Sequence, residues 1–542
     1  MTHSIRRGVA YATLIGAIAL GFPRSGHAQQ EARSHADSLI RAGDRAGRES
    51  RHRDAIDAYE RAISFDSTRR VGVLHRLGRQ YLWSDEPRHA AKLFTELLAK
   101  HPEACQAELD LGLAWSWANE LNAARATYDD VATRCLYERG QARLGAARAL
   151  RWDNQFSKAE RRYRQVLADG TDADREQAII GLIYVRLAQA EPRRALALAD
   201  SLLASGSRDP SLAEARVMAL ADLGAFGEAM EFARAARAEG RGSASLDRLT
   251  NGYSERGRPS FVAGVRAFRD RDGTSYGAAD IGSAVAPLFL GTFRVAARTA
   301  ELRDDSVSLR SQEAEASLEL RPAAALAITA RGGARRYDFE DFTPWDGEVD
   351  IVWLPGDRHR VDLAVARVML TDNIPAVQQR LVGDFASIGI TERLTSRFST
   401  AMSVDVTQWS EGNTRIRVRA TPRLSLEGVP VMTLEWPTIY QRYDEPFEFR
   451  LFSPPEYIET GPAFSVYQRV ARVWYLSVYA RGGALRETGR DWQPLGIARA
   501  SVEREISSHW GMRLEAAWSN SNLAGSTGFE RTTIGAGFSI RP

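Results

Sequence analysis

The stretch Arg415–Glu427, RIRVRATPRLSLE, alternates charged and apolar residues. Its charged residues share one parity and its apolar residues the other: Arg415, Arg417, Arg419, Arg423 and Glu427 against Ile416, Val418, Leu424 and Leu426. Because successive side chains of a strand point to opposite faces, one face of this segment is cationic and the other apolar. The stretch therefore predicts a β-strand with two chemically different faces.

Similar alternation recurs through the second half of the chain, as at 396–407, 510–518 and 533–540. Glycine, proline, aspartate or asparagine punctuates most segments, as at Pro355-Gly356-Asp357 and Glu411-Gly412-Asn413, which is typical of turns. We count about sixteen such segments, many longer than the five or six residues usual in soluble strands. Long alternating strands in even number predict an antiparallel transmembrane β-barrel.

Upstream the period is helical, and small and aromatic residues recur about every 34 residues, the length of paired helices in a solenoid. Leu74, Leu77, Gly78, Tyr81, Ala90, Phe94, Leu97 and Pro102 form the clearest copy. Their spacing resembles the tetratricopeptide (TPR) consensus. We expect about six repeats between Ala36 and Gly240. The fold class is thus α+β multidomain, with an all-α TPR solenoid before the barrel.

The TPR consensus positions have steric roles, because paired helices approach closely at small residues and aromatic rings fill the space between them. The residues predicted to pack in this way are Gly43, Ala55, Tyr59, Leu77, Gly78, Tyr81, Ala90, Phe94, Pro102, Gly112, Ala124 and Tyr128. A repeat must stack on its neighbours to bury a core, so these residues indicate packing and no particular ligand.

The N-terminus predicts export. Arg6 and Arg7 precede an apolar stretch from Gly8 to Phe22, and Gly26-His27-Ala28 offers small residues at a cleavage site, as in a secretory signal peptide. We therefore expect a signal peptide at 1–28, a periplasmic TPR solenoid at 29–240, a linker at 241–258 and an outer-membrane barrel at 259–542.

The net charge and the two cysteines bear on the partners and on the stability of the chain. A formal net charge of +3 over 542 residues gives no reason to expect nucleic acid as a partner.

The two cysteines, Cys105 and Cys135, fall at the start and the end of the third repeat, which an antiparallel hairpin brings together. In an oxidising periplasm we predict a disulfide that contributes about 3 to 4 kcal/mol; two buried free thiols are the alternative.

Catalytic motifs are absent from the sequence of the barrel half. Its two histidines, His359 and His509, lie beside a predicted turn and at a strand start. There is no nucleophile elbow, zinc-binding helix motif or phosphate-binding glycine loop. We therefore expect no catalytic residue, metal or cofactor and no enzyme, although a barrel hydrolase with serine and histidine on adjacent strands stays as a minor alternative.

The polar parity of the strands supplies the candidate pore lining. These residues are Arg397, Asp405, Arg415, Arg417, Arg419, Arg423, Glu435, Tyr457, Glu459, Tyr467, Arg469, Tyr475, Tyr479, Arg481, Arg513 and Glu515. Arginine forks and carboxylates there could exchange hydrogen bonds with the hydroxyls of a passing chain. Alternatively, opposite charges stabilise a filled barrel, and the tyrosines belong to the aromatic girdle of the membrane interface.

The order of a TPR solenoid and a barrel is similar to that of the outer-membrane export subunits for bacterial cellulose and poly-N-acetylglucosamine. Phe452-Ser453-Pro454-Pro455-Glu456-Tyr457 resembles an aromatic-Ser-Pro-x-x-Tyr turn of such barrels. Those subunits usually have longer TPR arrays, which favours a smaller relative such as the YaiO-like outer-membrane barrels. The resemblance implies an outer-membrane porin that exports a polysaccharide.

Three functions follow in order of preference. The first is an outer-membrane channel whose periplasmic arm docks proteins or guides a polar polymer such as an exopolysaccharide. The second is an outer-membrane-anchored scaffold with a closed barrel, and the third is the barrel hydrolase. We expect outer-membrane lipid and periplasmic proteins as partners, with polysaccharide as a further candidate, and we favour a monomer.

Overall fold

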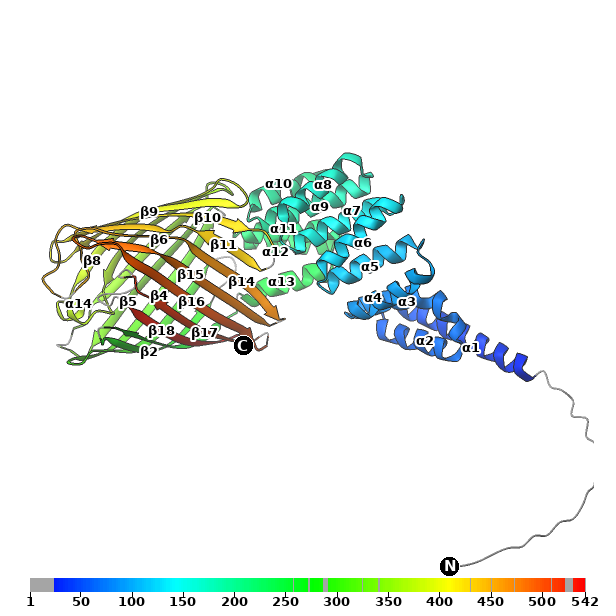
Figure 1. Ribbon diagram of the computed structural model, residues 1–542, viewed down its shortest axis with the longest axis horizontal. Helices are drawn as coiled ribbons and strands as arrows, with labels where there is room; N and C mark the ends of the chain where they lie inside the picture. The colour runs from blue at the N-terminus through cyan, green and yellow to red at the C-terminus, as the bar shows by residue number, and fades with distance from the viewer. Residues whose placement is uncertain are drawn as a thin grey trace, which may run out of the picture. The chain divides into compact units, whose positions relative to one another are not determined.

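The computed structural model describes residues 24–256, 258–271, 273–285, 291–323, 325–339, 342–428, 430–449, 451–471, 473–507, 509–521 and 530–541. Helices form the first part of the chain and strands the second (Figure 1). The chain forms two compact units, Met1–Gly145 and Ala146–Pro542. Of the predicted signal peptide, residues 1–23 lie outside the described residues, and α1 begins at Arg24.

The helices before the barrel repeat one hairpin design. They are α1 (Arg24–Arg48), α2 (His52–Phe65), the short 3-10 helix η1 (Ser67–Arg69), α3 (Arg70–Trp83), α4 (Pro87–Lys100), α5 (Cys105–Trp117), α6 (Leu121–Arg134), α7 (Arg139–Trp152), α8 (Phe156–Asp169), α9 (Asp172–Ala188), α10 (Pro192–Ala204), α11 (Pro210–Asp222), α12 (Phe226–Ala238) and α13 (Ala244–Arg256).

The turn inside each hairpin has the same backbone conformation. Its middle residue has a positive φ in all six hairpins of the described chain: Ser50, Asp85, Asn119, Asn154, Ala190 and Gly224. This left-handed conformation lets a helix end and reverse within three residues. The recurrence of one turn at the repeat spacing confirms a TPR solenoid.

The glycines of the first unit lie where the predicted steric roles place them. A Cβ atom on Gly78 would approach the ring of Phe94 to 2.6 Å, and one on Gly112 would approach Tyr128 to 2.7 Å. Gly43, Ala55, Tyr59, Leu77, Gly78, Ala90, Phe94, Gly112, Ala124 and Tyr128 are buried, Tyr81 is half-buried, and Pro102 is exposed after the end of α4. Aromatic rings thus fill the space that the glycines leave.

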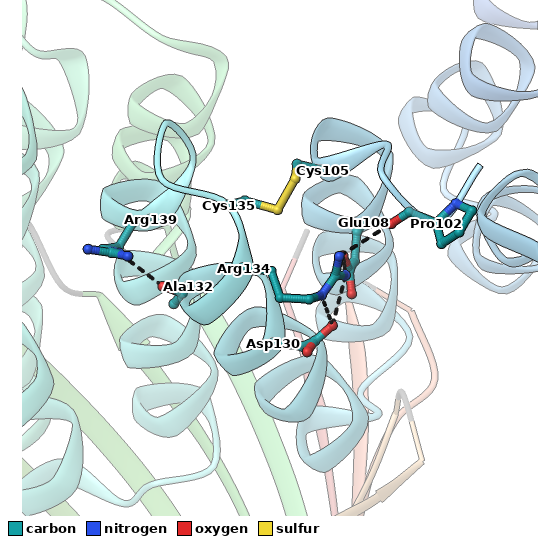
Figure 2. Close-up of a disulfide and its surroundings, with 8 residues drawn as sticks. All are labelled: Pro102, Cys105, Glu108, Asp130, Ala132, Arg134, Cys135 and Arg139. Atoms are coloured by element: carbon teal, nitrogen blue, oxygen red, sulfur yellow. Dashed lines mark hydrogen bonds and ion pairs between the residues drawn. A yellow bond between two sulfur atoms is a disulfide. The ribbon is translucent and has the colours of Figure 1, made fainter.

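A disulfide closes the third hairpin (Figure 2). Cys105 begins α5 and Cys135 follows α6, and their Cα atoms are 6.1 Å apart. Arg134 reinforces this end, because it donates to the carbonyl of Pro102 at 3.3 Å and to Asp130 at 2.9 Å. The hairpin is therefore held at its open end by a covalent bond and by the hydrogen bond from Arg134 to Pro102.

The last helix ends the solenoid core. Leu246 and Tyr253 of α13 pack against apolar residues of α11 and α12, so the segment 241–258, predicted as a linker, is largely helical. From Ala146 onward the helices belong to the same compact unit as the strands.

The strands are β1 (Ser260–Asp270), β2 (Ser275–Val285), β3 (Thr292–Arg303), β4 (Ser308–Ala323), β5 (Leu326–Tyr337), β6 (Trp345–Trp353), β7 (His359–Met369), β8 (Val382–Arg393), β9 (Phe398–Trp409), β10 (Thr414–Leu426), β11 (Val431–Glu435), β12 (Thr438–Tyr443), β13 (Tyr457–Thr460), β14 (Ala463–Ala471), β15 (Trp474–Glu487), β16 (Gln493–Glu505), β17 (Trp510–Ser519) and β18 (Arg531–Ile540). A short helix, α14 (Ile374–Gln378), lies between β7 and β8. Every pairing is antiparallel, and β1 pairs with both β2 and β18, which closes the sheet into a barrel.

Two of the barrel's strands are interrupted. Both β11 and β12 pair with β10, and both β13 and β14 pair with β15. The eighteen β-segments of the described chain therefore form sixteen strands of the barrel wall, as predicted from the sequence. Pro437 and Pro462 lie at the two interruptions, where the lack of a backbone N–H prevents continuous pairing.

We call the end of the barrel where β1 begins and β18 ends the near end, and the opposite one the far end. The near-end connections are short, as at 354–358 and 394–397, whereas the far end has longer ones at 370–381 and 444–456. Among the described helices, none has the length and apolar character of a membrane span.

Candidate functional site: the lumen of the barrel

The barrel wall separates an apolar outer face from a polar inner face. Val265, Ile281, Ile388 and Leu514 project outward and are exposed. Neighbouring positions of the opposite parity are charged and face the interior, and Asp405 there is fully buried. An apolar band around a closed sheet with a polar interior is the arrangement of outer-membrane barrels.

The register places the sequence-predicted lining residues on the inner face. Fifteen of the sixteen lie on strands, in the parity of Asp405, whereas Arg397 lies in the near-end turn 394–397 and pairs with Glu427 at 2.9 Å. They form separate groups, of which the first surrounds Asp405 and the second surrounds Glu459.

Three arginines surround the single carboxylate of Asp405 on β9. Arg419 lies 3.0 Å from it, Arg415 3.3 Å and Arg417 3.7 Å. Arg415 also donates to the hydroxyl of Thr407 at 2.7 Å. The cluster therefore has more positive than negative charge, and its guanidinium groups are largely buried in the wall.

The second group fills the interruption of the wall. Glu459 accepts hydrogen bonds from Arg481 at 2.7 Å, from Tyr457 at 2.8 Å and from Ser521 at 2.5 Å. Arg481 also donates to the carbonyl of Pro437 at 2.9 Å, which the interruption leaves without a strand partner. This buried network stabilises the break between β11 and β12, and Tyr457 presents no open ring face.

Four of the remaining candidates, Tyr475, Tyr479, Arg513 and Glu515, line open space. Arg423 pairs with Glu435 at 2.7 Å, and Tyr467 stacks on Tyr475 with centroids 6.2 Å apart. Two cavities of about 970 and 820 Å³ lie beside β1 and β16–β18. Both are lined by Arg266, Arg513 and Glu515, with Tyr475 at the first and Tyr479 at the second. The lumen is thus hollow on this side.

At the far end, α14 packs against the inner face of the barrel, a feature that sequence reasoning missed. Ile374 and Val377 pack with Leu302 and Tyr337 on one side of the lumen. Ala376 and Leu381 pack with Trp409 and Tyr443 on another. Figure 1 shows α14 at the far end of the barrel. This apolar helix contacts β3, β5, β9 and β12, and we call it the plug.

A single arginine, Arg531, binds the segment between β7 and α14 to the barrel wall. Arg531 at the start of β18 forms a fork to Asp270 of β1, at 2.6 and 2.8 Å, and reaches Asp372, two residues before α14, at 2.8 Å. Its guanidinium lies 3.8 Å from the ring centroid of Phe268. Bidentate arginine–carboxylate pairs have defined geometry, so this group holds the connection in place.

The near-end turns bind the ends of helices within the second compact unit. Glu427 accepts from the backbone N–H of Ser157 at the start of α8 at 3.1 Å. Asp357 accepts from the N–H groups of Arg193 and Arg194 at the start of α10, at 3.1 and 3.0 Å. Neither helix has a side-chain cap from its own N-cap residue. Barrel carboxylates therefore serve as their N-caps.

The same rim also binds helix C-termini and turns. Arg393 donates to the carbonyls of Gln189 and Ala190, at 2.7 and 2.9 Å, just after α9. Asn154 donates to the carbonyl of Gly428 at 3.3 Å. Cations at helix C-termini and anions at N-termini both complement the helix dipole, which explains why the later repeats and the barrel form one unit.

His359 lies on the outward parity at the start of β7, and its Nδ1 is 2.5 Å from a carboxylate oxygen of Glu392. His509 precedes β17 at the near end. Neither belongs to the Asp405 or Glu459 groups, and the absence of catalysis stays a prediction.

No family model and no curated protein matches the chain. A solved "bacterial polysaccharide outer membrane secretin" is 13% identical over 53% of this chain and 99% of its own, with a TM-score of 0.45. A tetratricopeptide repeat protein from Parabacteroides merdae is 15% identical over 41% of this chain and 88% of its own, with a TM-score of 0.33. CdiB from Acinetobacter baumannii is 9% identical over 52% of this chain and 60% of its own, with a TM-score of 0.35.

The chain has the fold of a TPR solenoid followed by an outer-membrane-type barrel. Two features of the structure support this conclusion: the six equivalent hairpin turns and the closed barrel of sixteen strands.

Proposed function

We propose that this protein is an outer-membrane channel that exports a polar polymer, such as an exopolysaccharide, with its TPR arm in the periplasm. The observation that carries the proposal is the combination of an apolar outer face with a charged, partly hollow lumen. Lipid would surround the outer face, and charged side chains would replace water around the passing chain.

The orientation follows from the connections. Outer-membrane barrels have short periplasmic turns and longer extracellular loops. The near end has the short turns, both ends of the barrel sequence and the contacts with the solenoid helices. We therefore assign the near end to the periplasm and α14 to the extracellular mouth, where it would act as a gate.

The physiological test is deletion of the gene. We expect cells to lose surface polymer while they continue to synthesise it, so polymer accumulates inside the outer membrane. Quantification of surface and periplasmic polysaccharide separates export from synthesis. Unchanged secretion would exclude this substrate class.

A second candidate function is a membrane-anchored scaffold, in which the TPR groove binds periplasmic proteins and the barrel stays closed. The α14 plug favours it, because its apolar contacts occupy part of the far end. Planar-bilayer recordings of the full chain separate the two: a scaffold shows no conductance under any voltage or in any plug variant, whereas a gated channel opens.

A further inference from the structure

The arginine cluster on β10 points to the charge of the cargo. We propose that Arg415, Arg417 and Arg419 form a binding site for anionic groups on the exported polysaccharide. This inference rests on the proposed export function and adds a substrate class to it. The ligand chemistry is a carboxylate, sulfate or phosphate carried on a polymer chain.

The first argument is charge balance. One carboxylate, Asp405, faces three guanidinium groups within 3.7 Å, which leaves two positive charges uncompensated inside this group. Side-chain exposure is 13% for Arg415 and 17% for Arg417. Buried charges without a counterion are costly, so an incoming anion would stabilise the wall.

The second argument is unused hydrogen-bonding capacity. The Nε atoms of Arg415 and Arg417 are buried and have no hydrogen-bond partner. A guanidinium offers five donors in a planar fork that fits carboxylate and phosphate groups. The site therefore has donors in place that neither Asp405 nor Thr407 satisfies.

The third argument is the path along the strand. Alternate residues on one face of a strand are about 7 Å apart, so the row from Arg415 to Arg423 extends over several such steps. Arg415 lies at the plug, since its guanidinium is 5.8 Å from the ring centroid of Trp409, which packs on α14. Arg423 lies toward the near end and pairs with Glu435. A row of this length suits a polymer with repeated charges better than a single small ion.

Acidic residues of the wall gather elsewhere, on β4 and β6. Glu313 pairs with Arg335 at 2.6 Å, and Glu348 pairs with Arg331 and also lies near Glu315, Asp346 and Asp350. The excess of cations therefore belongs to the Asp405 group and not to the wall as a whole.

Calorimetric titration of the full-length protein in detergent tests the proposal without requiring an open channel. The probes are an oligogalacturonate for carboxylates, dextran sulfate for sulfate groups, and neutral dextran. We expect the anionic probes to bind, neutral dextran to bind at least tenfold more weakly, and affinity to fall as salt screens the charges. The stronger anionic probe identifies the type of charged group.

The decisive variant is Arg417→Gln with Arg419→Gln, for which we expect at least a tenfold loss of anion affinity. Arg417→Lys with Arg419→Lys retains the charge and should retain part of the affinity. Arg367→Gln is the matched control, because Arg367 of β7 has the outward parity and already pairs with Asp384 at 3.3 Å. A difference in gel migration between heated and unheated samples verifies that each barrel is folded.

Equal affinity of the Gln variant and the wild type would overturn the proposal, as would an equal loss in the Arg367 control. These results leave the export function standing if gene deletion still abolishes surface polymer. Conversely, unchanged secretion in the deletion strain refutes the export function, while the binding data judge the anion site independently.

Discussion

The two ends of the barrel make different kinds of contact. At the far end apolar residues of α14 pack against lumen-facing side chains of several strands. At the near end carboxylates and an arginine on short turns bind the exposed backbone groups of solenoid helices. Apolar packing inside a lumen can be released without breaking the wall, whereas helix caps fix two elements together. From this comparison we expect α14 to be the movable part and the near end the rigid part.

Charging the plug should have the largest effect. Ile374→Asp with Val377→Asp places two carboxylates in an apolar contact, where unpaired charges are strongly disfavoured, and should expel α14 from the lumen. We expect single-channel conductance to rise at least tenfold in planar bilayers. Ile374→Val is the control, since it keeps the contact apolar. Unchanged conductance in the charged variant would show that α14 does not close the lumen.

Removal of the Arg531 ion pairs should have a smaller effect. Arg531→Gln removes the ionic links to Asp270 and Asp372 but leaves the apolar contacts of α14. We expect open events to become several-fold more frequent at the same conductance. Arg310→Gln serves as the comparison, because Arg310 is an exposed residue near the far end with a 3.9 Å contact to Glu301. If both variants open with the same frequency, Arg531 has no special role in holding α14.

Removal of a near-end cap should cost about 1 kcal/mol of local stability, as for other N-cap substitutions. Asp357→Ala should raise amide exchange at Arg193 and Arg194 about fivefold, and Glu427→Ala should do the same at Ser157. Hydrogen-exchange mass spectrometry of α8 and α10 measures this change. Asp384→Asn, at an exposed carboxylate of β8, should leave both helices unchanged. Protection that is insensitive to both cap variants would mean that the rim does not hold the helices.

The smallest effect should be a pH dependence of the Glu427 contact. Burial raises the pKa of Glu427, but hydrogen bonds from Ser157 and Arg397 outweigh it, so the pKa is below its ordinary value. A lowered pKa in the folded state means stabilisation that is present above the unfolded value, about 4.3, and is lost as pH falls through the folded value. Exchange at the start of α8 should therefore accelerate below about pH 4, and Glu427→Gln should remove this acceleration.

Local patterns predicted the repeats and the wall, because both depend on short-range rules. The period of about 34 residues reflects the stacking of Gly78 on Phe94 and its equivalents. The alternation from Arg415 to Glu427 reflects the two faces of one strand, and it placed Asp405 and Arg417 on the same side before any register was known.

Contacts distant in sequence were beyond such reasoning. Arg531 meets Asp270 because the barrel closes, and no local pattern joins them. The caps at Ser157 and Arg193 depend on turns more than 150 residues away. A signal for α14 did exist, since Asn373 caps the N–H of Ala376 and Pro375 lies in the first turn, a common helix start.

Tyr457 shows the same limit. Its parity predicted an inward position, but the sequence could not show that Phe452, Leu485 and Leu495 would cover it. A candidate stacking platform is therefore a buried member of the Glu459 network.

The most direct test of the central claim is spin-label accessibility on β16 in lipid vesicles. Single cysteines at 498 to 502 suffice, because Cys105 and Cys135 are joined and leave no free thiol among the described residues. The account predicts a period of two: labels at Ala498, Ala500 and Val502 relax with lipid-soluble oxygen, and labels at Arg499 and Ser501 relax with a water-soluble nickel complex. Uniform exposure to water, or a helical period, would contradict a barrel whose alternate side chains face lipid and lumen.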